Sequence, residues 1–180
     1  MRYCAFLRAI NVGKANRIRM EELRALCGAV GFEEVSTYLQ TGNIHFAWAG
    51  KTEEARDTLE GALTERGLKN AFAMVWPREE LVTFVAGEPF ANHAPETHRQ
   101  YVTLYRDPLP ADILEALDAA DTTVALAPRI HCSAYPLETR TVDVMDSPLA
   151  KRIKVPGTTR YWHVFRDFLE AGQQRLPRAQ

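Results

Sequence analysis

The chain has 180 residues, 46% of them hydrophobic and 25% charged, and its formal net charge is −1 at pH 7. This composition is that of an ordinary globular protein, and it excludes disordered and fibrous chains. A balanced charge also argues against a dedicated nonspecific nucleic-acid binder. The length suits one domain, or two small subdomains that are tightly joined, so we expect one compact unit.

We expect a cytoplasmic protein without a membrane span. No segment reaches the roughly 20 consecutive apolar residues that a transmembrane helix needs. The N-terminus passes from Met1 directly into an apolar run at residues 3–7, without the successive regions of a signal peptide. The three cysteines, Cys4, Cys27 and Cys132, lack a CxxC spacing, which predicts buried thiols rather than disulfides or a structural zinc site.

The first half of the chain predicts the element order β-α-β-β-α-β. Apolar runs and alternating apolar residues predict strands over residues 3–7, 35–39, 44–48 and 71–76. Apolar residues at helical spacing predict one helix from Met20 to a stop at Gly31, and another from Thr52 to a stop at Gly67. The tight turn predicted at residues 41–43 would join the second and third strands as a hairpin.

The second half predicts a similar order after a boundary in the irregular residues 88–98. A short helix begins at Pro77, before this boundary. Strands are predicted over residues 101–105, 122–127 and 130–135, a helix around residues 113–117, a further strand over residues 141–144 and a short helix from Ser147 or Pro148. Thr158 is predicted to cap a final helix whose buried face holds Trp162, Phe165, Phe168 and Leu169.

The repeated element order predicts the fold class. We expect an α+β fold of two ferredoxin-like halves of the β-α-β-β-α-β type, packed as one compact unit with C-terminal helices. The expected ranges are residues 1–87 for the N-terminal subdomain, 88–172 for the C-terminal α+β subdomain and 173–180 for a disordered tail. The two halves show no repeat at the level of individual residues.

No familiar catalytic motif is present. The chain lacks a P-loop, a GxGxxG dinucleotide fingerprint, a GxSxG nucleophile elbow and an HExxH zinc motif. His93 and His98 have no familiar metal-ligand spacing and are interpreted as solvated loop residues, so no metal site is predicted. His131 and Cys132 are neighbours on a predicted strand and would point to opposite faces, which argues against a dyad. Catalytic residues and cofactors therefore stay unknown.

Polar side chains in two loops form the first candidate ligand site. Residues 1–20 contain no carboxylate, and neither do residues 147–165. The loop residues are Arg8, Asn11, Asn16 and Arg17 after the first strand, and Gln40, Thr41 and Asn43 at the hairpin turn. Neighbouring strands of a ferredoxin-like half would bring the two loops together. The alternative is that Asn11 and Asn43 cap turns and that the arginines are solvated.

A second candidate group is Thr158, Thr159 and Arg160, at the predicted start of the last helix. Free backbone N–H groups at a helix start favour anions, and an arginine adds bidentate hydrogen bonds suited to phosphate or carboxylate. The alternative is that Thr158 only caps the helix and that Trp162 anchors it in the core.

These same motifs resemble a bacterial family catalogued as domain of unknown function 1697. The resemblance is carried by Leu7-Arg8-Ala9-Ile10-Asn11-Val12-Gly13, Asn16-Arg17, Met20 with Leu23-Arg24-Ala25-Leu26, Gly31-Phe32, Tyr38-Leu39-Gln40-Thr41-Gly42-Asn43 with Phe46, and Thr158-Thr159-Arg160 with Trp162. The sequence departs from the pattern at Ala9, where glycine is common, and at Tyr161, where asparagine often stands. The resemblance implies an α+β fold with ferredoxin-like halves and no established activity.

The leading hypothesis is binding of a small anionic ligand, such as a phosphorylated one, by the loop residues and the group at 158–160. A nucleic-acid-binding module is the first alternative, because ferredoxin-like sheets can present aromatic rings on which bases stack, although the expected aromatic-rich strand is missing. An interaction or structural protein that pairs through edge strands is the other. The sequence identifies neither an enzyme class nor an oligomeric state.

Overall fold

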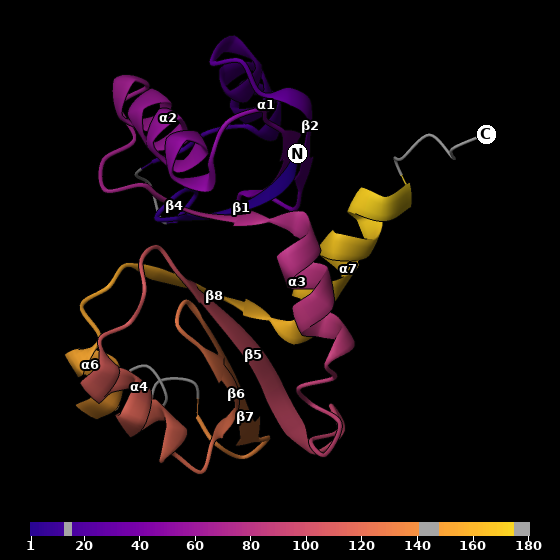
Figure 1. Ribbon diagram of the computed structural model, residues 1–180, viewed down its shortest axis with the longest axis vertical. Helices are drawn as coiled ribbons and strands as arrows, with labels where there is room; N and C mark the ends of the chain where they lie inside the picture. Colours follow the sequence, from indigo (N-terminus) through magenta and orange to yellow (C-terminus); the bar gives the residue numbers. More distant parts are fainter. Residues whose placement is uncertain (13–15, 141–147, 175–180) are drawn as a thin grey trace. The chain divides into compact units, whose positions relative to one another are not determined.

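The computed structural model describes residues 1–12, 16–140 and 148–174 (Figure 1). The chain forms two compact units: unit 1 is Met1–Thr83 together with the residues from Phe168 on, and unit 2 is Phe84–Asp167. The end of the last helix therefore belongs with unit 1, whereas the sequence analysis assigned it to residues 88–172. Each unit is described by itself below.

Unit 1 holds a four-stranded antiparallel sheet in the order β2-β3-β1-β4. Its elements are β1 (Arg2–Arg8), α1 (Met20–Ala29), β2 (Glu33–Tyr38), β3 (Asn43–Ala47), α2 (Thr52–Glu65) and β4 (Phe72–Pro77), after which α3 (Arg78–Ala86) begins. All of these elements were predicted from the sequence, with ends that differ by a few residues.

The strand β1 lies between β3 and β4, as expected of an inner strand from its apolar run, and both of its faces are buried. Tyr3, Ala5 and Leu7 face the core formed with α1 and α2. Successive side chains of a strand point to opposite faces, so Cys4 and Phe6 lie on the other side. The end of α7 (Trp162–Gln174) packs there: the Phe168 ring lies 5.1 Å from the Phe6 ring, centroid to centroid.

Unit 2 repeats this arrangement with a sheet in the order β6-β7-β5-β8. Its elements are β5 (His98–Tyr105), α4 (Ala111–Asp118), β6 (Thr123–Ala127), β7 (Ile130–Pro136), α6 (Pro148–Arg152) and β8 (Gly157–Tyr161). Each sheet has four antiparallel strands, and in each the first strand of its unit is central. The predicted α+β class with two similar halves is confirmed, and the topology is consistent with ferredoxin-like halves.

The strand β8 corrects one prediction. Thr158 was expected to cap a helix, but residues 157–161 pair with β5 and complete the second sheet, and the helix begins only at Trp162. Threonine and tyrosine have high strand propensity, and an unpaired edge of β5 supplies the hydrogen-bond partners. The expected buried face is confirmed for Trp162, Phe165, Phe168 and Leu169.

Three remaining expectations concern the last part of the chain. The short helix begins at Pro148, one of the two starts predicted, whereas the strand expected over residues 141–144 lies outside the described residues. Helix α7 continues past Gly172 to Gln174, and the rest of the expected tail also lies outside them. Among the described residues, no helix is both long and apolar enough to cross a membrane.

Candidate functional site

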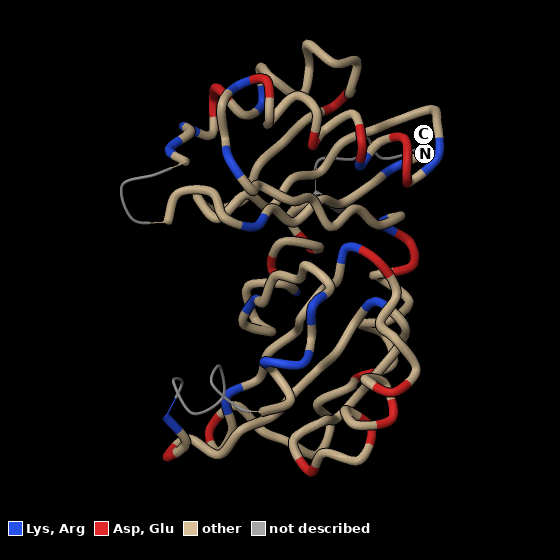
Figure 2. The backbone as a smooth tube through the Cα atoms, turned by 90° about the vertical axis from the view of Figure 1, so that its left-hand side faces the viewer, with Lys and Arg blue, Asp and Glu red and all other residues tan. Residues whose placement is uncertain are grey.

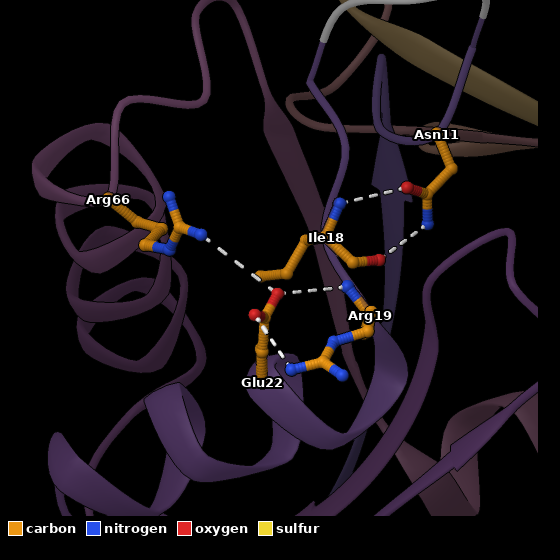
Figure 3. Close-up of polar contacts among 5 residues, drawn as sticks. All are labelled: Asn11, Ile18, Arg19, Glu22 and Arg66. Atoms are coloured by element: carbon orange, nitrogen blue, oxygen red, sulfur yellow. Dashed lines mark hydrogen bonds and ion pairs between the residues drawn. The ribbon is translucent and has the colours of Figure 1, made fainter.

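Asn11 fixes the loop that follows β1. Its Nδ2 donates hydrogen bonds to the carbonyl oxygens of Ile18, at 3.0 Å, and of Gln40, at 2.9 Å. Its Oδ1 accepts one from the Ile18 N–H at 2.9 Å (Figure 3). Asn11 has a φ of 53°, in the left-handed region that asparagine tolerates better than most residues. Both amide donors are therefore used within the fold, and the hydrogen bond to Gln40 joins the two predicted loops.

Asn16 ties the same loop to the connection between α2 and β4. Its Nδ2 donates to the carbonyl oxygens of Ala9, at 2.7 Å, and of Lys69, at 2.6 Å, and its Oδ1 accepts from the Lys69 N–H at 3.0 Å. Asn16 also has a positive φ, of 52°. Asn11 and Asn16 thus tie the described residues on both sides of positions 13–15 to neighbouring backbone.

Asn43 closes the hairpin turn between β2 and β3. Its side chain is buried, and its Nδ2 donates to the Tyr38 carbonyl oxygen at 2.9 Å and to Thr41 Oγ1 at 3.1 Å. Buried amides need such partners, because an unsatisfied donor costs about 1–3 kcal/mol. The contacts of Asn11 and Asn43 favour the alternative in which these two residues stabilise turns, and the contacts of Asn16 are likewise structural.

The two arginines of this loop cluster have no such contacts. Arg8, at the end of β1, and Arg17 are both exposed. Within the described part of the chain, neither guanidinium makes a hydrogen bond or an ion pair. Gln40 and Thr41, in the hairpin turn between β2 and β3, are also exposed. The positive charge that the loop cluster could offer a ligand therefore comes from Arg8 and Arg17.

Charged residues next to the loop are engaged with each other. Glu22 of α1 accepts from the Arg19 N–H at 3.2 Å and pairs with the Arg19 guanidinium at 3.3 Å, and Arg66 lies 3.9 Å away (Figure 3). These hydrogen bonds lower the pKa of the Glu22 carboxyl below its usual value. Acidic and basic positions are interspersed along unit 1 (Figure 2).

The second predicted group lies in unit 2, on β8. Arg160 Nη1 donates to Thr158 Oγ1 at 2.6 Å and to the Thr159 carbonyl oxygen at 3.0 Å. Burial lowers the pKa of the Arg160 guanidinium to about 10. Thr159 Oγ1 lies 2.9 Å from Thr103 Oγ1 on the neighbouring strand. Since these residues form a strand, the expected helix start with free N–H groups is wrong.

A cavity in unit 1, which was not predicted from the sequence, brings together charged and polar side chains. It has a volume of about 290 Å³, and its lining includes Arg2, Glu34, Ser36, His45 and Arg78. Arg2 Nη2 and Glu34 Oε2 form an ion pair at 2.6 Å. Glu34 has a φ of 51° and lies where the pairing of β2 with β3 shifts register. Such bulges redirect side chains and are frequent next to functional sites.

Arg78 is the residue of this cavity with unused hydrogen-bonding capacity. Its Nη2 donates to the carbonyl oxygen of Leu169 at 3.0 Å. Its Nε is buried and has no hydrogen-bond partner among the described residues. A buried guanidinium donor without a partner is costly, so it favours an acceptor that enters the cavity.

His45 of the cavity lining lies directly opposite Cys4, on the neighbouring strands β3 and β1. Cys4 Sγ lies 3.4 Å from His45 Nδ1, and His45 Nε2 lies 2.8 Å from the Phe168 carbonyl oxygen. A carbonyl only accepts, so Nε2 carries the proton and Nδ1 accepts from the thiol. Burial raises the pKa of the Cys4 thiol well above its usual value, and the nearby charge of Arg78 opposes this effect.

The sequence analysis predicted the strands that hold Cys4 and His45, but it did not predict the contact between them. Both residues lie in strands that were predicted, but a cross-strand contact depends on strand order and register, which were not predicted residue by residue. His131 and Cys132, adjacent in the chain, are separated as expected, since His131 Nε2 pairs instead with Thr123 Oγ1 at 2.9 Å. In the described part of the chain, no group of three or more His, Cys, Asp or Glu side chains could hold a metal ion.

Comparisons with known proteins identify the family. A family model described as a protein of unknown function, DUF1697, matches residues 1–129, which include the first block of motif residues. A solved structure of a conserved bacterial protein from Streptococcus pneumoniae is similar, with a TM-score of 0.68 and 21% identity over 96% of this chain and 98% of that one. No curated protein matches the chain. The chain belongs to the DUF1697 family.

Proposed function

We propose that the protein binds a small anionic ligand in the cytoplasm, a phosphate or carboxylate compound, in the cavity lined by Arg78. The observation that carries the proposal is the Arg78 guanidinium, which lines the cavity and has a buried Nε without a partner among the described residues. A guanidinium offers planar, paired donors that match the oxygens of phosphate and carboxylate.

The charges around the cavity support an anion rather than a cation. The ion pair between Arg2 and Glu34 largely cancels, whereas Arg78 has no ion-pair partner among the described residues. The remaining net charge of the lining is therefore positive. The hydroxyl of Ser36, whose side chain is almost fully buried, is a further donor in the same lining.

The size of the cavity favours a small ligand. Its volume of about 290 Å³ is at the lower end of the roughly 300–1,000 Å³ of small-molecule sites. A second cavity of about 550 Å³ shares Arg2, Glu34 and Arg78 with the first. A ligand with one anionic group on Arg78 could therefore extend past the Arg2–Glu34 pair.

The test is thermal denaturation of the full chain with sodium phosphate, sodium sulfate, acetate and small phosphorylated metabolites, at constant ionic strength. A ligand at a hundred times its Kd is expected to add about 2.7 kcal/mol to the free energy of unfolding. Arg78→Met removes the donors from the cavity and should weaken binding about tenfold or more, because each charge-assisted hydrogen bond contributes about 1.5–3 kcal/mol.

Arg8→Met is the matched control, since it makes the same change in the exposed loop cluster. If the cavity is the site, Arg8→Met and Arg17→Met leave anion affinity unchanged. If either loop variant loses affinity while Arg78→Met keeps it, the loop residues predicted from the sequence form the site instead. Wild-type protein that no anion stabilises would contradict the proposal as a whole.

Single-stranded RNA binding is a second candidate, favoured by one observation in unit 2. The rings of Tyr101 and Tyr161, opposite each other on β5 and β8, lie 5.0 Å apart, and His163 stacks on Tyr161 at 5.6 Å. Tyr161 is 48% exposed. Bases stack on such rings. Tyr161→Ala should weaken the binding of a labelled oligonucleotide, and Tyr161→Leu is the control for side-chain size. Equal affinity of the oligonucleotide for wild type and for both variants would exclude this surface.

A further inference from the structure

We infer that Cys4 is a modification site: its thiol, paired with His45 and covered by the end of α7, is a latent nucleophile for small anionic electrophiles that enter the neighbouring cavity. The choice of electrophile rests on the proposed function, because His45 and Arg78 line that cavity. The reactivity of the thiol rests on the cross-strand pair itself.

The orientation of His45 makes it a base for this thiol. Its Nε2–H donates to the Phe168 carbonyl oxygen, and its ring stacks on the Phe168 ring at 3.8 Å with an interplanar angle of 12°. These contacts direct the lone pair of Nδ1 toward Cys4 Sγ, 3.4 Å away. A base held beside a thiol in this way can take its proton as the sulfur attacks, so the reactive thiolate forms during the reaction.

Cys27 and Cys132 provide an internal comparison. All three thiols are fully buried, so exposure does not distinguish them. Burial raises the pKa of all three thiols, to about 12 for Cys27 and Cys132 and further for Cys4, so the pKa values alone do not favour Cys4. Cys4 differs in geometry, because His45 Nδ1 lies 3.4 Å from its sulfur and is placed to accept its proton. If Cys4 reacts faster than Cys27 and Cys132, the difference would therefore be due to its contact with His45.

The end of α7 covers the pair through close contacts. Phe168 is fully buried against Phe6 and His45, and Arg78 holds the next carbonyl, that of Leu169. Gly172 lies so near His45 that a Cβ built on it would be 2.6 Å from Cε1 and 2.7 Å from Nε2 of the ring. Only a residue without a side chain allows this approach, so a larger residue would lift the cover.

The reaction with iodoacetate is a balanced test of this chemistry. The Cys4 thiol gives its proton to His45 Nδ1, and the sulfur attacks the methylene carbon of the reagent. A carbon–sulfur bond forms while the carbon–iodine bond breaks, iodide leaves, and the imidazolium releases its proton to solvent. Iodoacetamide reacts by the same displacement but lacks the carboxylate that Arg78 would attract.

The experiment measures alkylation of each cysteine in the full-length folded protein by peptide mass spectrometry. Cys4 should react about tenfold faster than Cys27 and Cys132, as expected of a thiol with a base partner. Relative to glutathione, the ratio of iodoacetate to iodoacetamide rates should be higher at Cys4, and sodium phosphate should slow its reaction with iodoacetate. His45→Gln should bring Cys4 down to the rate of the other two.

Gly172→Ala tests the cover, and Gly61→Ala is its control because a Cβ at Gly61 meets no atom within 4 Å. Gly172→Ala should increase the rate of Cys4 alkylation several-fold, because it favours local opening of the end of α7. Gly61→Ala should leave this rate unchanged. Thermal denaturation of each variant verifies that it folds.

The outcomes separate this inference from the proposed function. If Cys4 reacts no faster than Cys27 and Cys132 in wild type and in Gly172→Ala, the inference is wrong even where phosphate stabilises the protein. If Cys4 reacts selectively but equally with both reagents, and phosphate has no effect, the reactive thiol is supported and the anion site is contradicted.

Discussion

The loop cluster and the Arg78 cavity, both in unit 1, use their polar side chains in opposite ways. In the loop cluster, the side-chain amides of Asn11 and Asn16 each donate two hydrogen bonds to backbone carbonyl oxygens. In the cavity, Arg78 Nη2 donates to the Leu169 carbonyl oxygen, whereas its buried Nε has no hydrogen-bond partner among the described residues. The capacity to bind a ligand therefore depends on which hydrogen-bond donors have no partner within the folded protein. A cluster of polar residues in the sequence does not show which donors these are.

The arginines of the two regions show the same contrast. Arg8 is exposed, whereas Arg78 Nε is buried. Hydrogen bonds and charge interactions are stronger where water is excluded, and exposed charges are screened by salt. We therefore expect substitutions in the loop cluster to change stability without changing anion affinity, and substitutions in the cavity to do the reverse.

The largest expected effect is that of Gly42→Ala at the hairpin turn. Gly42 has a φ of 76°, and a Cβ there would lie 2.6 Å from Ile10 Cδ1 and 2.8 Å from Leu7 Cβ. A left-handed backbone costs an alanine about 1–2 kcal/mol and overpacking costs about 1–3 kcal/mol, so we expect a loss of about 3 kcal/mol. Urea denaturation measures this loss, and phosphate affinity should stay unchanged.

Gly67→Ala is the control for backbone strain alone, because Gly67 has a φ of 88° and nothing within 4 Å of a built Cβ. It should cost about 1 kcal/mol, the left-handed term without the clash. Equal losses in the two variants would mean that the turn tolerates the added methyl group. The close approach of the turn to β1 would then not be needed for stability.

A smaller loss is expected for Asn11→Asp, which keeps the shape of the side chain and removes its donors. The Ile18 and Gln40 carbonyl oxygens would then face a carboxylate in place of an amide N–H. Two lost hydrogen bonds, each contributing about 0.5–1.5 kcal/mol, predict a loss of about 2 kcal/mol. Urea denaturation at neutral pH measures it.

Anion titration of the same variant bears directly on the comparison between the regions. Phosphate affinity equal to that of wild type, with the stability loss above, would support a structural role for Asn11. A weaker affinity at unchanged stability would show instead that Asn11 belongs to a ligand site in the loops.

The fold was largely predictable because its signals are local. The apolar run at residues 3–7 predicted an inner strand, and the helical spacing of Leu59 and Leu63 predicted the buried side of α2. The strand β8 was not predicted, because Thr158 and Thr159 suit both a helix cap and a strand. The free edge of β5 decides between them, and that edge exists only in the assembled sheet.

The candidate sites were less predictable, because they depend on pairing between distant segments. The meeting of the two loops was expected from topology, and the hydrogen bond from Asn11 to the Gln40 carbonyl oxygen joins them. The contact between Cys4 and His45 spans 41 positions and needs the exact register of β1 on β3. A shift of one residue would place the two side chains on opposite faces.

The smallest expected effect, and the one that separates charge from fold, is that of Glu34→Gln. The carboxylate of Glu34 pairs with Arg2 at 2.6 Å and lines the cavity, so it opposes any anion held by Arg78. Its removal frees Arg2 and should tighten phosphate binding about threefold, because a partly exposed charge pair contributes only about 0.2–1 kcal/mol. Glu33→Gln is the control: it removes the neighbouring exposed carboxylate, which does not line the cavity. Equal tightening in both variants would mean that net charge alone attracts the anion, and weaker binding in Glu34→Gln would mean that Glu34 positions Arg2 for the ligand.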